Sequence, residues 1–237
     1  KKEIADAQKA AEEAAKPAEI EITALVVSDC PDCYDPSLLI NNLKNNPQLK
    51  VIKEEKVEYS SDQGKILVQR YNLSRVPSVL ITGQTAKAME RALFLNNLGK
   101  RIEEVLVINN LPSPYFDLTS GQVRGRYTLI YLTDKSCTEC YDVKFHRQII
   151  EGFAGKPFEE QIIDQADSNG RELISKYKIK KLPTILLRGD LAENKRLQLI
   201  WSRVGTIEKD NTYVFRSTEL MGNYFDLETK KVEKVKL

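Results

Sequence analysis

Apolar residues in the first half of the chain form short continuous runs that alternate with helix-spaced stripes. Runs of aliphatic residues are typical of buried strands, and apolar residues three or four positions apart are typical of helices with one buried face. We therefore predict strands at about 20–27, 49–58, 76–81 and 104–109, separated by helices at about 38–46, 61–71 and 86–98. This alternation indicates an α/β domain.

The second half of the chain repeats this pattern. Residues 170–177 (GRELISKY) match residues 64–71 (GKILVQRY), and residues 182–186 (LPTIL) match residues 76–80 (VPSVL), in both cases 106 positions later. A repeat of this length indicates duplicated domains rather than a solenoid.

Each repeat ends in the same tail sequence. Residues 115–118 and residues 224–227 both read YFDL, and the Thr, Ser and Gly residues near them predict a small hairpin that closes the repeat. We therefore expect one domain at residues 19–125 and a second at residues 126–237, each with a central mixed sheet flanked by helices.

The first 18 residues have a different composition from the rest. Residues 3–16 (EIADAQKAAEEAAK) are rich in alanine and strongly helix-forming, and Pro17 stops the helix. Because they contain few large apolar side chains, we predict that residues 1–18 are a helical spacer, either a solvated end or a stalk that holds the rest away from a membrane.

Localisation is predicted from the same end of the chain. No run approaches the ~18 to 20 apolar residues that cross a bilayer, so no membrane span is expected in this chain. The chain begins at Lys1 rather than Met, which leaves room for a signal peptide or an N-terminal anchor that has been lost. We expect an extracytoplasmic protein, or a membrane-anchored one facing outward, with a cytoplasmic location as the alternative.

Charge and composition exclude several function classes. The formal net charge of the 237 residues is only +2, with no basic cluster, so no nucleic-acid partner is expected. The one histidine, His146, nearly excludes a histidine-rich metal site or a Ser-His-Asp mechanism. We expect it to be a surface or packing residue rather than a proton shuttle. No cofactor is predicted.

All four cysteines lie in two Cys-x-x-Cys motifs, Cys30 to Cys33 and Cys137 to Cys140, 107 residues apart. In each repeat a buried strand runs into the motif, and we predict that the motif opens a helix. Unpaired amides and the dipole at a helix N-terminus favour the thiolate, so Cys30 and Cys137 are the predicted attacking groups. Cys33 and Cys140, one turn later, would resolve the mixed disulfide.

The strand, the motif and a proline about 46 residues later give each half a resemblance to a thioredoxin-fold domain. The tandem arrangement is similar to the two-unit protein disulfide oxidoreductase and protein disulfide isomerase family. The resemblance implies a thiol-disulfide oxidoreductase that exchanges disulfides with protein substrates, or relays electrons through its two centres. Its partners would be protein thiols, protein disulfides or a redox partner protein.

The resemblance also assigns a substrate-binding role to residues outside the motifs. It implies that Pro77 and Pro183 follow cis peptide bonds and lie beside the cysteines. Val76 and Leu182 would then offer their backbone to an extended substrate.

The chain departs from the thioredoxin pattern at several points. Asp29 and Ser136 stand where a tryptophan is usual before the first cysteine. A helix is predicted between the proline strand and the next strand, and the YFDL tail replaces the closing helix. The family's substrates are therefore not carried over.

An acidic residue lies inside each motif, Asp32 in the first and Glu139 in the second. A carboxylate there opposes thiolate formation by roughly 1 kcal/mol or less at an exposed site. Because a stabilised thiolate makes a strong oxidant, we expect Asp32 and Glu139 to tune both pairs towards the reducing or exchange range.

A Tyr-Asp pair also follows each motif, at residues 34–35 and 141–142. The tyrosines are expected to pack under the following helix. The aspartates are expected to favour the helix N-terminus, or else to assist proton transfer, with the structural role preferred.

Two other interpretations of the cysteines remain open. A disulfide that closes so short a loop removes little chain entropy, which disfavours a purely structural role. The two pairs are separated by 103 residues, far beyond zinc-ribbon spacing, although separate domains can meet around a metal. The alternative is therefore a thioredoxin-fold metal-binding or adaptor module that uses the cysteines as ligands.

Overall fold

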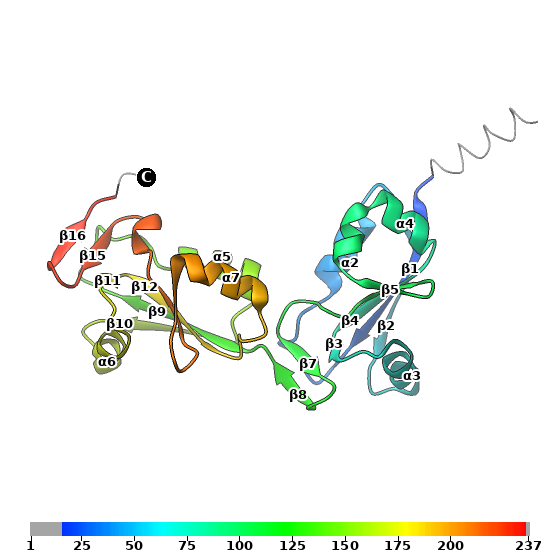
Figure 1. Ribbon diagram of the computed structural model, residues 1–237, viewed down its shortest axis with the longest axis horizontal. Helices are drawn as coiled ribbons and strands as arrows, with labels where there is room; N and C mark the ends of the chain where they lie inside the picture. The colour runs from blue at the N-terminus through cyan, green and yellow to red at the C-terminus, as the bar shows by residue number, and fades with distance from the viewer. Residues whose placement is uncertain (1–15, 236–237) are drawn as a thin grey trace, which may run out of the picture. The chain divides into compact units, whose positions relative to one another are not determined.

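The computed structural model describes residues 16–235, which form two compact units (Figure 1). Unit 1 ends at Val123 and unit 2 begins at Arg124, two residues before the boundary expected from the repeat. Most of the expected N-terminal spacer lies outside the described residues. Within the described part of the chain, no helix is both long enough and apolar enough to cross a membrane.

Each unit contains a five-stranded mixed sheet with flanking helices, as the sequence predicts. In unit 1 the strand order is β2-β1-β4-β6-β5. The strands are β1 (Ala18–Val26), β2 (Leu49–Glu58), β4 (Ser78–Gly83), β5 (Lys100–Ile102) and β6 (Val105–Ile108). The helices are α2 (Ser37–Lys44), α3 (Asp62–Tyr71), α4 (Thr85–Arg91) and the 3-10 helix η1 (Leu93–Asn97).

Unit 2 has the same topology, with the strand order β10-β9-β12-β14-β13. The strands are β9 (Tyr127–Thr133), β10 (Glu159–Asp164), β12 (Thr184–Gly189), β13 (Gly205–Ile207) and β14 (Tyr213–Phe215). The helices are α5 (Phe145–Ala154), α6 (Ser168–Tyr177), α7 (Lys195–Val204) and the 3-10 helix η2 (Thr218–Leu220).

Strands β1 and β9, the central strands that lead into the cysteine motifs, each pair with a neighbour on both sides, and β1 is buried along one face from Ala18 to Ala24. In unit 1, β1 runs parallel to β2 and antiparallel to β4. Alternate residues of β1 from Ala18 to Ala24 contribute to the core cluster under α2 and α4, and Leu25 contributes to the cluster under α3. In Figure 1, α2 and α4 accordingly lie on one side of the sheet and α3 on the other, with α5, α7 and α6 arranged in the same way in unit 2.

A glycine in the first turn of α3, and again of α6, sets how closely each helix approaches the sheet. A β-carbon on Gly64 would lie 2.2 Å from the carbonyl oxygen of Glu58, and one on Gly170 would lie 2.0 Å from that of Asp164. Neither site has room for a side chain, which explains why both repeats have glycine there. Ser61 caps α3, since its hydroxyl accepts a hydrogen bond from the Gly64 N–H at 3.0 Å.

The predicted helix at 86–98 is divided into α4 and η1, and β5, which follows it, was not predicted. The tail of each repeat forms a small sheet, as expected. In unit 1 it consists of β3 (Arg75–Val76), β7 (Tyr115–Asp117) and β8 (Gln122–Arg124). In unit 2 it consists of β11 (Lys181–Leu182), β15 (Tyr224–Asp226) and β16 (Lys231–Glu233).

Candidate active site

The cysteines of each motif form a disulfide with one another. The S–S distance is 2.04 Å between Cys30 and Cys33, and 2.07 Å between Cys137 and Cys140. Both disulfides lie in turns that follow the central strand of a unit. The described part of the chain therefore has two intramotif disulfides and no free cysteine.

The prediction that each motif opens a helix is wrong. Helix α2 begins at Ser37 and α5 begins at Phe145, several residues after each motif. In unit 1 the Tyr34 N–H donates to the Pro114 carbonyl at 2.7 Å instead of to a helical partner, and Pro36 restricts the residue before it. In unit 2 the Tyr141 N–H likewise donates to the carbonyl of Asn223, at 2.9 Å. Neither pair of sulfurs is placed at a helix N-terminus.

The repeated Tyr-Asp sequence has a structural role in both units. Each tyrosine amide ties the motif to the segment just before the tail strand. Each aspartate lies just before the next helix and accepts from the backbone two residues later: Asp35 Oδ1 accepts from the Ser37 N–H and Asp142 Oδ1 from the Lys144 N–H, both at 2.9 Å. Hydrogen bonds from Ser37 lower the pKa of Asp35 below its ordinary value.

The structure has the two cis-prolines that the resemblance implies. The Val76–Pro77 and Leu182–Pro183 bonds are cis. In unit 2 the Cys140 sulfur lies 3.8 Å from the Leu182 carbonyl oxygen, and the Tyr141 hydroxyl donates to the Pro183 carbonyl at 3.0 Å. A disulfide therefore lies directly beside the cis-proline.

The backbone before each cis-proline is paired with the tail of its own unit. Val76 lies opposite Phe116 in the antiparallel pair of β3 and β7, and Leu182 lies opposite Phe225 in the pair of β11 and β15. The strand edge that the resemblance assigns to an extended substrate is therefore already paired. The pairing of the tail with this strand was not predicted, although the YFDL repeat was the signal for it.

The two cysteine pairs differ in accessibility. Cys30, the predicted attacking group of unit 1, is buried in the core cluster under α3 and is only 5% exposed, whereas Cys33 is partly exposed. Both Cys137 and Cys140 are partly exposed. The Asp32 carboxylate lies 3.7 Å from the Cys30 sulfur, so its negative charge opposes a thiolate there.

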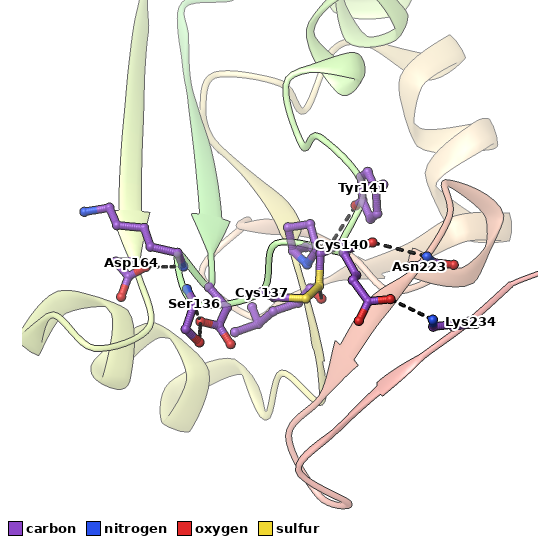
Figure 2. Close-up of a disulfide and its surroundings, with 12 residues drawn as sticks. Ser136, Cys137, Cys140, Tyr141, Asp164, Asn223 and Lys234 are labelled. Atoms are coloured by element: carbon purple, nitrogen blue, oxygen red, sulfur yellow. Dashed lines mark hydrogen bonds and ion pairs between the residues drawn. A yellow bond between two sulfur atoms is a disulfide. The ribbon is translucent and has the colours of Figure 1, made fainter.

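The second disulfide lies between two polar groups (Figure 2). On one side the Asn223 side chain donates to the Glu139 carbonyl at 3.2 Å, and Lys234 forms an ion pair of 2.7 Å with the Glu139 carboxylate. On the other side the Ser136 amide donates to the buried Asp134 at 2.9 Å. Glu139 therefore has a basic partner on the tail.

His146 packs inside unit 2, in agreement with the packing role expected for it. It is 2% exposed, its Nε2 lies 2.9 Å from the Tyr141 hydroxyl, and its ring meets Phe215 edge-on at 4.6 Å. Burial lowers the pKa of His146 to about 4 and raises that of Tyr141 above its ordinary value.

The metal-binding alternative gains no support from the geometry. Among residues 16–235, no three His, Cys, Asp or Glu side chains come close enough together to hold a metal ion.

Comparisons with known proteins give only weak likenesses. No protein-family model and no curated protein matches the sequence. One similar solved structure is the NTD_N/C domain of the alkylhydroperoxide reductase AhpF from Enterococcus faecalis, with 12% identity over 79% of this chain and 90% of that chain and a TM-score of 0.24. Another is a protein disulfide oxidoreductase from Aeropyrum pernix, with 16% identity over 78% of this chain and 83% of that chain and a TM-score of 0.21.

The fold assignment rests on the topology of the chain itself. Each unit has a central strand parallel to one neighbour and antiparallel to the other, followed by a Cys-x-x-Cys disulfide and, later, a cis-proline. Each unit is thus a thioredoxin-like domain with an intramotif disulfide at the end of its central strand.

Proposed function

We propose that this chain is a thiol-disulfide oxidoreductase that exchanges disulfides with protein thiols. One observation carries the proposal: two units of divergent sequence keep the same Cys-x-x-Cys disulfide at the end of the same strand. A cis-proline accompanies it in both units. The four cysteines of the chain are all used in this arrangement.

The reaction is a two-step exchange. A substrate thiolate attacks one sulfur of the disulfide, the S–S bond breaks, and the electron pair leaves on the other cysteine. A second substrate thiol then displaces the mixed disulfide. The protein ends with two thiols and the substrate with a disulfide, and the reverse sequence reduces a substrate disulfide.

The exposures distinguish the two sulfurs in unit 1 only. There Cys33 is the accessible sulfur and Cys30 is the leaving group, the reverse of the expectation from the sequence. In unit 2 both sulfurs are partly exposed, so Cys137 keeps the attacking role and Cys140 the resolving role that the sequence analysis assigns to them. The surroundings of the disulfides would be shaped by Val76, Pro77, Leu182 and Pro183. A substrate strand could pair with the backbone of Val76 or Leu182 only after the tail strand had separated from it.

Insulin reduction with dithiothreitol tests the function. We expect the wild type to turn over, the variants Cys30→Ser/Cys33→Ser and Cys137→Ser/Cys140→Ser each to retain one active unit, and the variant without cysteines to be inactive. Equal activity in the wild type and the cysteine-free variant would refute the proposal. A reduced protein that binds zinc stoichiometrically and exchanges no disulfides would support the metal-binding alternative.

Single variants test the assignment of the reacting sulfurs in unit 1. With the second pair replaced by serine, Cys30→Ser leaves Cys33 free and Cys33→Ser leaves Cys30 free. We expect the free Cys33 to react faster with a neutral disulfide such as 2,2′-dithiodipyridine. Faster reaction of Cys30 would return the attacking role to it.

A further inference from the structure

A cavity of about 930 Å³ opens beside the second motif, entirely within unit 2. Its wall includes Ser136, the residue before Cys137, and Figure 2 shows Ser136 and Asp164 on the side of the disulfide away from Asn223 and Lys234. Ile174, Ile179 and Leu227 supply its apolar part. A substrate held in this cavity would therefore lie next to the disulfide.

Basic side chains surround the cavity from three separate parts of the unit. They come from the turn after β9, from α6 with the segment after it, and from the hairpin between β15 and β16. The five residues are Lys135, Arg171, Lys178, Lys180 and Lys230.

The acidic residues of the cavity are already engaged. Asp134 and Asp164 are 9% and 7% exposed. Asp134 accepts from the Ser136 amide at 2.9 Å, and Asp164 accepts from the Lys135 and Ala166 amides at 2.7 and 2.9 Å.

The third carboxylate of the cavity, Glu228, forms an ion pair of 2.9 Å with Lys180. The ammonium groups of Lys135, Lys178 and Lys230, by contrast, have no ion pair among the described residues. The charge that remains to meet a ligand is therefore positive.

Unit 1 keeps only one of these five basic positions, because Lys65 is the equivalent of Arg171. Its residues at the positions of the four cavity lysines are uncharged: Ser28, Asn72, Ser74 and Gly121. At the position of Gln165, which lines the cavity, unit 1 has Tyr59, whose ring packs on Phe116 with centroids 5.2 Å apart. The two disulfides consequently lie in different electrostatic surroundings.

Lys230 occupies a backbone position that usually favours glycine. Its φ is 59°, and the equivalent residue of unit 1 is Gly121, with a φ of 67°. The tail hairpin thus presents an ammonium group at the cavity from a position where a β-carbon is disfavoured.

We propose that this cavity binds an acidic segment of a protein substrate, next to the reacting cysteine of that substrate. Unit 2 then exchanges preferentially with cysteines flanked by Asp and Glu, whereas unit 1 does not discriminate by charge. The inference rests on the proposed function and names the substrate class of the second site. Complementary charge acts mainly by accelerating association, and salt weakens it.

The spread of the basic groups favours a chain segment over a small acidic thiol. The cations of the cavity lie on three separate elements, which suits several carboxylates spread along a peptide.

The chemical step conserves electrons and protons. The substrate thiol loses its proton to solvent, and its thiolate attacks the Cys137 sulfur. The Cys137–Cys140 bond breaks, and the electron pair leaves on Cys140, which takes a proton from solvent. A second substrate thiol then displaces Cys137, and two thiols are oxidised to one disulfide while the pair of unit 2 is reduced.

Peptide exchange kinetics test the proposal with the full chain. The Cys30→Ser/Cys33→Ser variant isolates the second pair, and the Cys137→Ser/Cys140→Ser variant isolates the first. Three peptides carry one cysteine flanked by Glu, Gln or Lys. Each rate of mixed-disulfide formation is divided by the rate of the same peptide with neutral hydroxyethyl disulfide, which removes differences in thiol reactivity.

We expect the second pair to react about tenfold faster with the Glu peptide than with the Lys peptide at low salt. This preference should largely disappear at about 0.5 M salt, where the Debye length is only a few ångströms. The first pair should show no preference. In the second pair, Lys178→Glu/Lys230→Glu should abolish or invert the preference, whereas the matched charge change Lys195→Glu/Lys209→Glu, outside the cavity, should keep it.

Two results would overturn the inference while the proposed function stands: equal normalised rates for the three peptides at the second pair, or loss of the preference in the control variant as well. A third result would also overturn the inference: glutathione reacts faster than its neutral dimethyl ester, but the three peptides react at equal rates. This result would assign the cavity to a small acidic thiol. Failure of every peptide to react would instead refute the proposed function.

Discussion

His146 should make the stability of unit 2 fall in mild acid. The unfolded chain takes up a proton on this histidine near pH 6.5, whereas burial lowers the pKa in the folded unit to about 4. The full stability is therefore present above about pH 6.5 and is lost as the pH falls towards 4. At ~1.4 kcal/mol per pH unit, the loss is about 2 kcal/mol at pH 5 and approaches about 3 kcal/mol near pH 4.

The only tryptophan of the chain provides a local assay. Trp201 is 1% exposed in the core of unit 2, so its fluorescence follows the unfolding of this unit in urea. Between pH 7 and pH 5 the midpoint should fall by about 1 M urea, given a typical slope of 1–3 kcal/mol per M. Carboxylates with ordinary or lowered pKa values contribute little in this window.

The matched variant is His146→Leu, because unit 1 has the buried residue Leu39 at the equivalent position. Leucine cannot titrate, and the Tyr141 hydroxyl keeps its bond to the Pro183 carbonyl. The midpoint of this variant should change little between pH 7 and pH 5. An equal acid-induced loss in the wild type and in His146→Leu would refute the reasoning.

Three further predictions concern packing and redox tuning. Gly170→Ala should destabilise unit 2 by about 3 kcal/mol or more, because the new β-carbon would lie 2.0 Å from a strand carbonyl. The control Gly152→Ala, in a helix with open space around it, should stabilise by about 0.5–1 kcal/mol, as urea unfolding would measure. Thr218→Val should raise the stability of unit 2 by about 1 kcal/mol, since the buried Thr218 hydroxyl has no partner among the described residues. A loss of stability would show instead that the hydroxyl makes a stabilising hydrogen bond. Asp32→Asn should raise the potential of the first pair by up to about 20 mV in a glutathione titration, because it removes a negative charge 3.7 Å from the Cys30 sulfur. A lowered potential would contradict this argument.

The parts of the fold that sequence alone predicts are those set by local patterns. Apolar runs and helical spacing place four of the five strands of the sheet in unit 1, and the strand predicted at 49–58 matches β2 residue for residue. Ser61 is followed by a helix that it caps, because a serine hydroxyl at this position accepts a backbone N–H whatever the tertiary structure. Because the sequence repeats, the elements predicted for the first domain also predict those of the second.

The geometry of the site depends on contacts that no local pattern reveals. The helix expected at each motif is displaced because the amides of Tyr34 and Tyr141 bond to carbonyls more than 75 residues away in sequence. The burial of Cys30 follows from packing against residues of several elements, and the basic cavity gathers lysines from distant segments. The sequence shows these residues, but only the fold brings them together.

The hydrogen bond between each motif and its tail joins a main-chain N–H group to a main-chain carbonyl group. The acceptor is the carbonyl of Pro114 in unit 1 and of Asn223 in unit 2, two residues with unrelated side chains. Every residue type has this carbonyl, so substitutions in the tail can change the chemical environment of the disulfide while its position is kept. The tail is therefore where one ancestral domain, once duplicated, could acquire two substrate preferences without rebuilding its reactive centre.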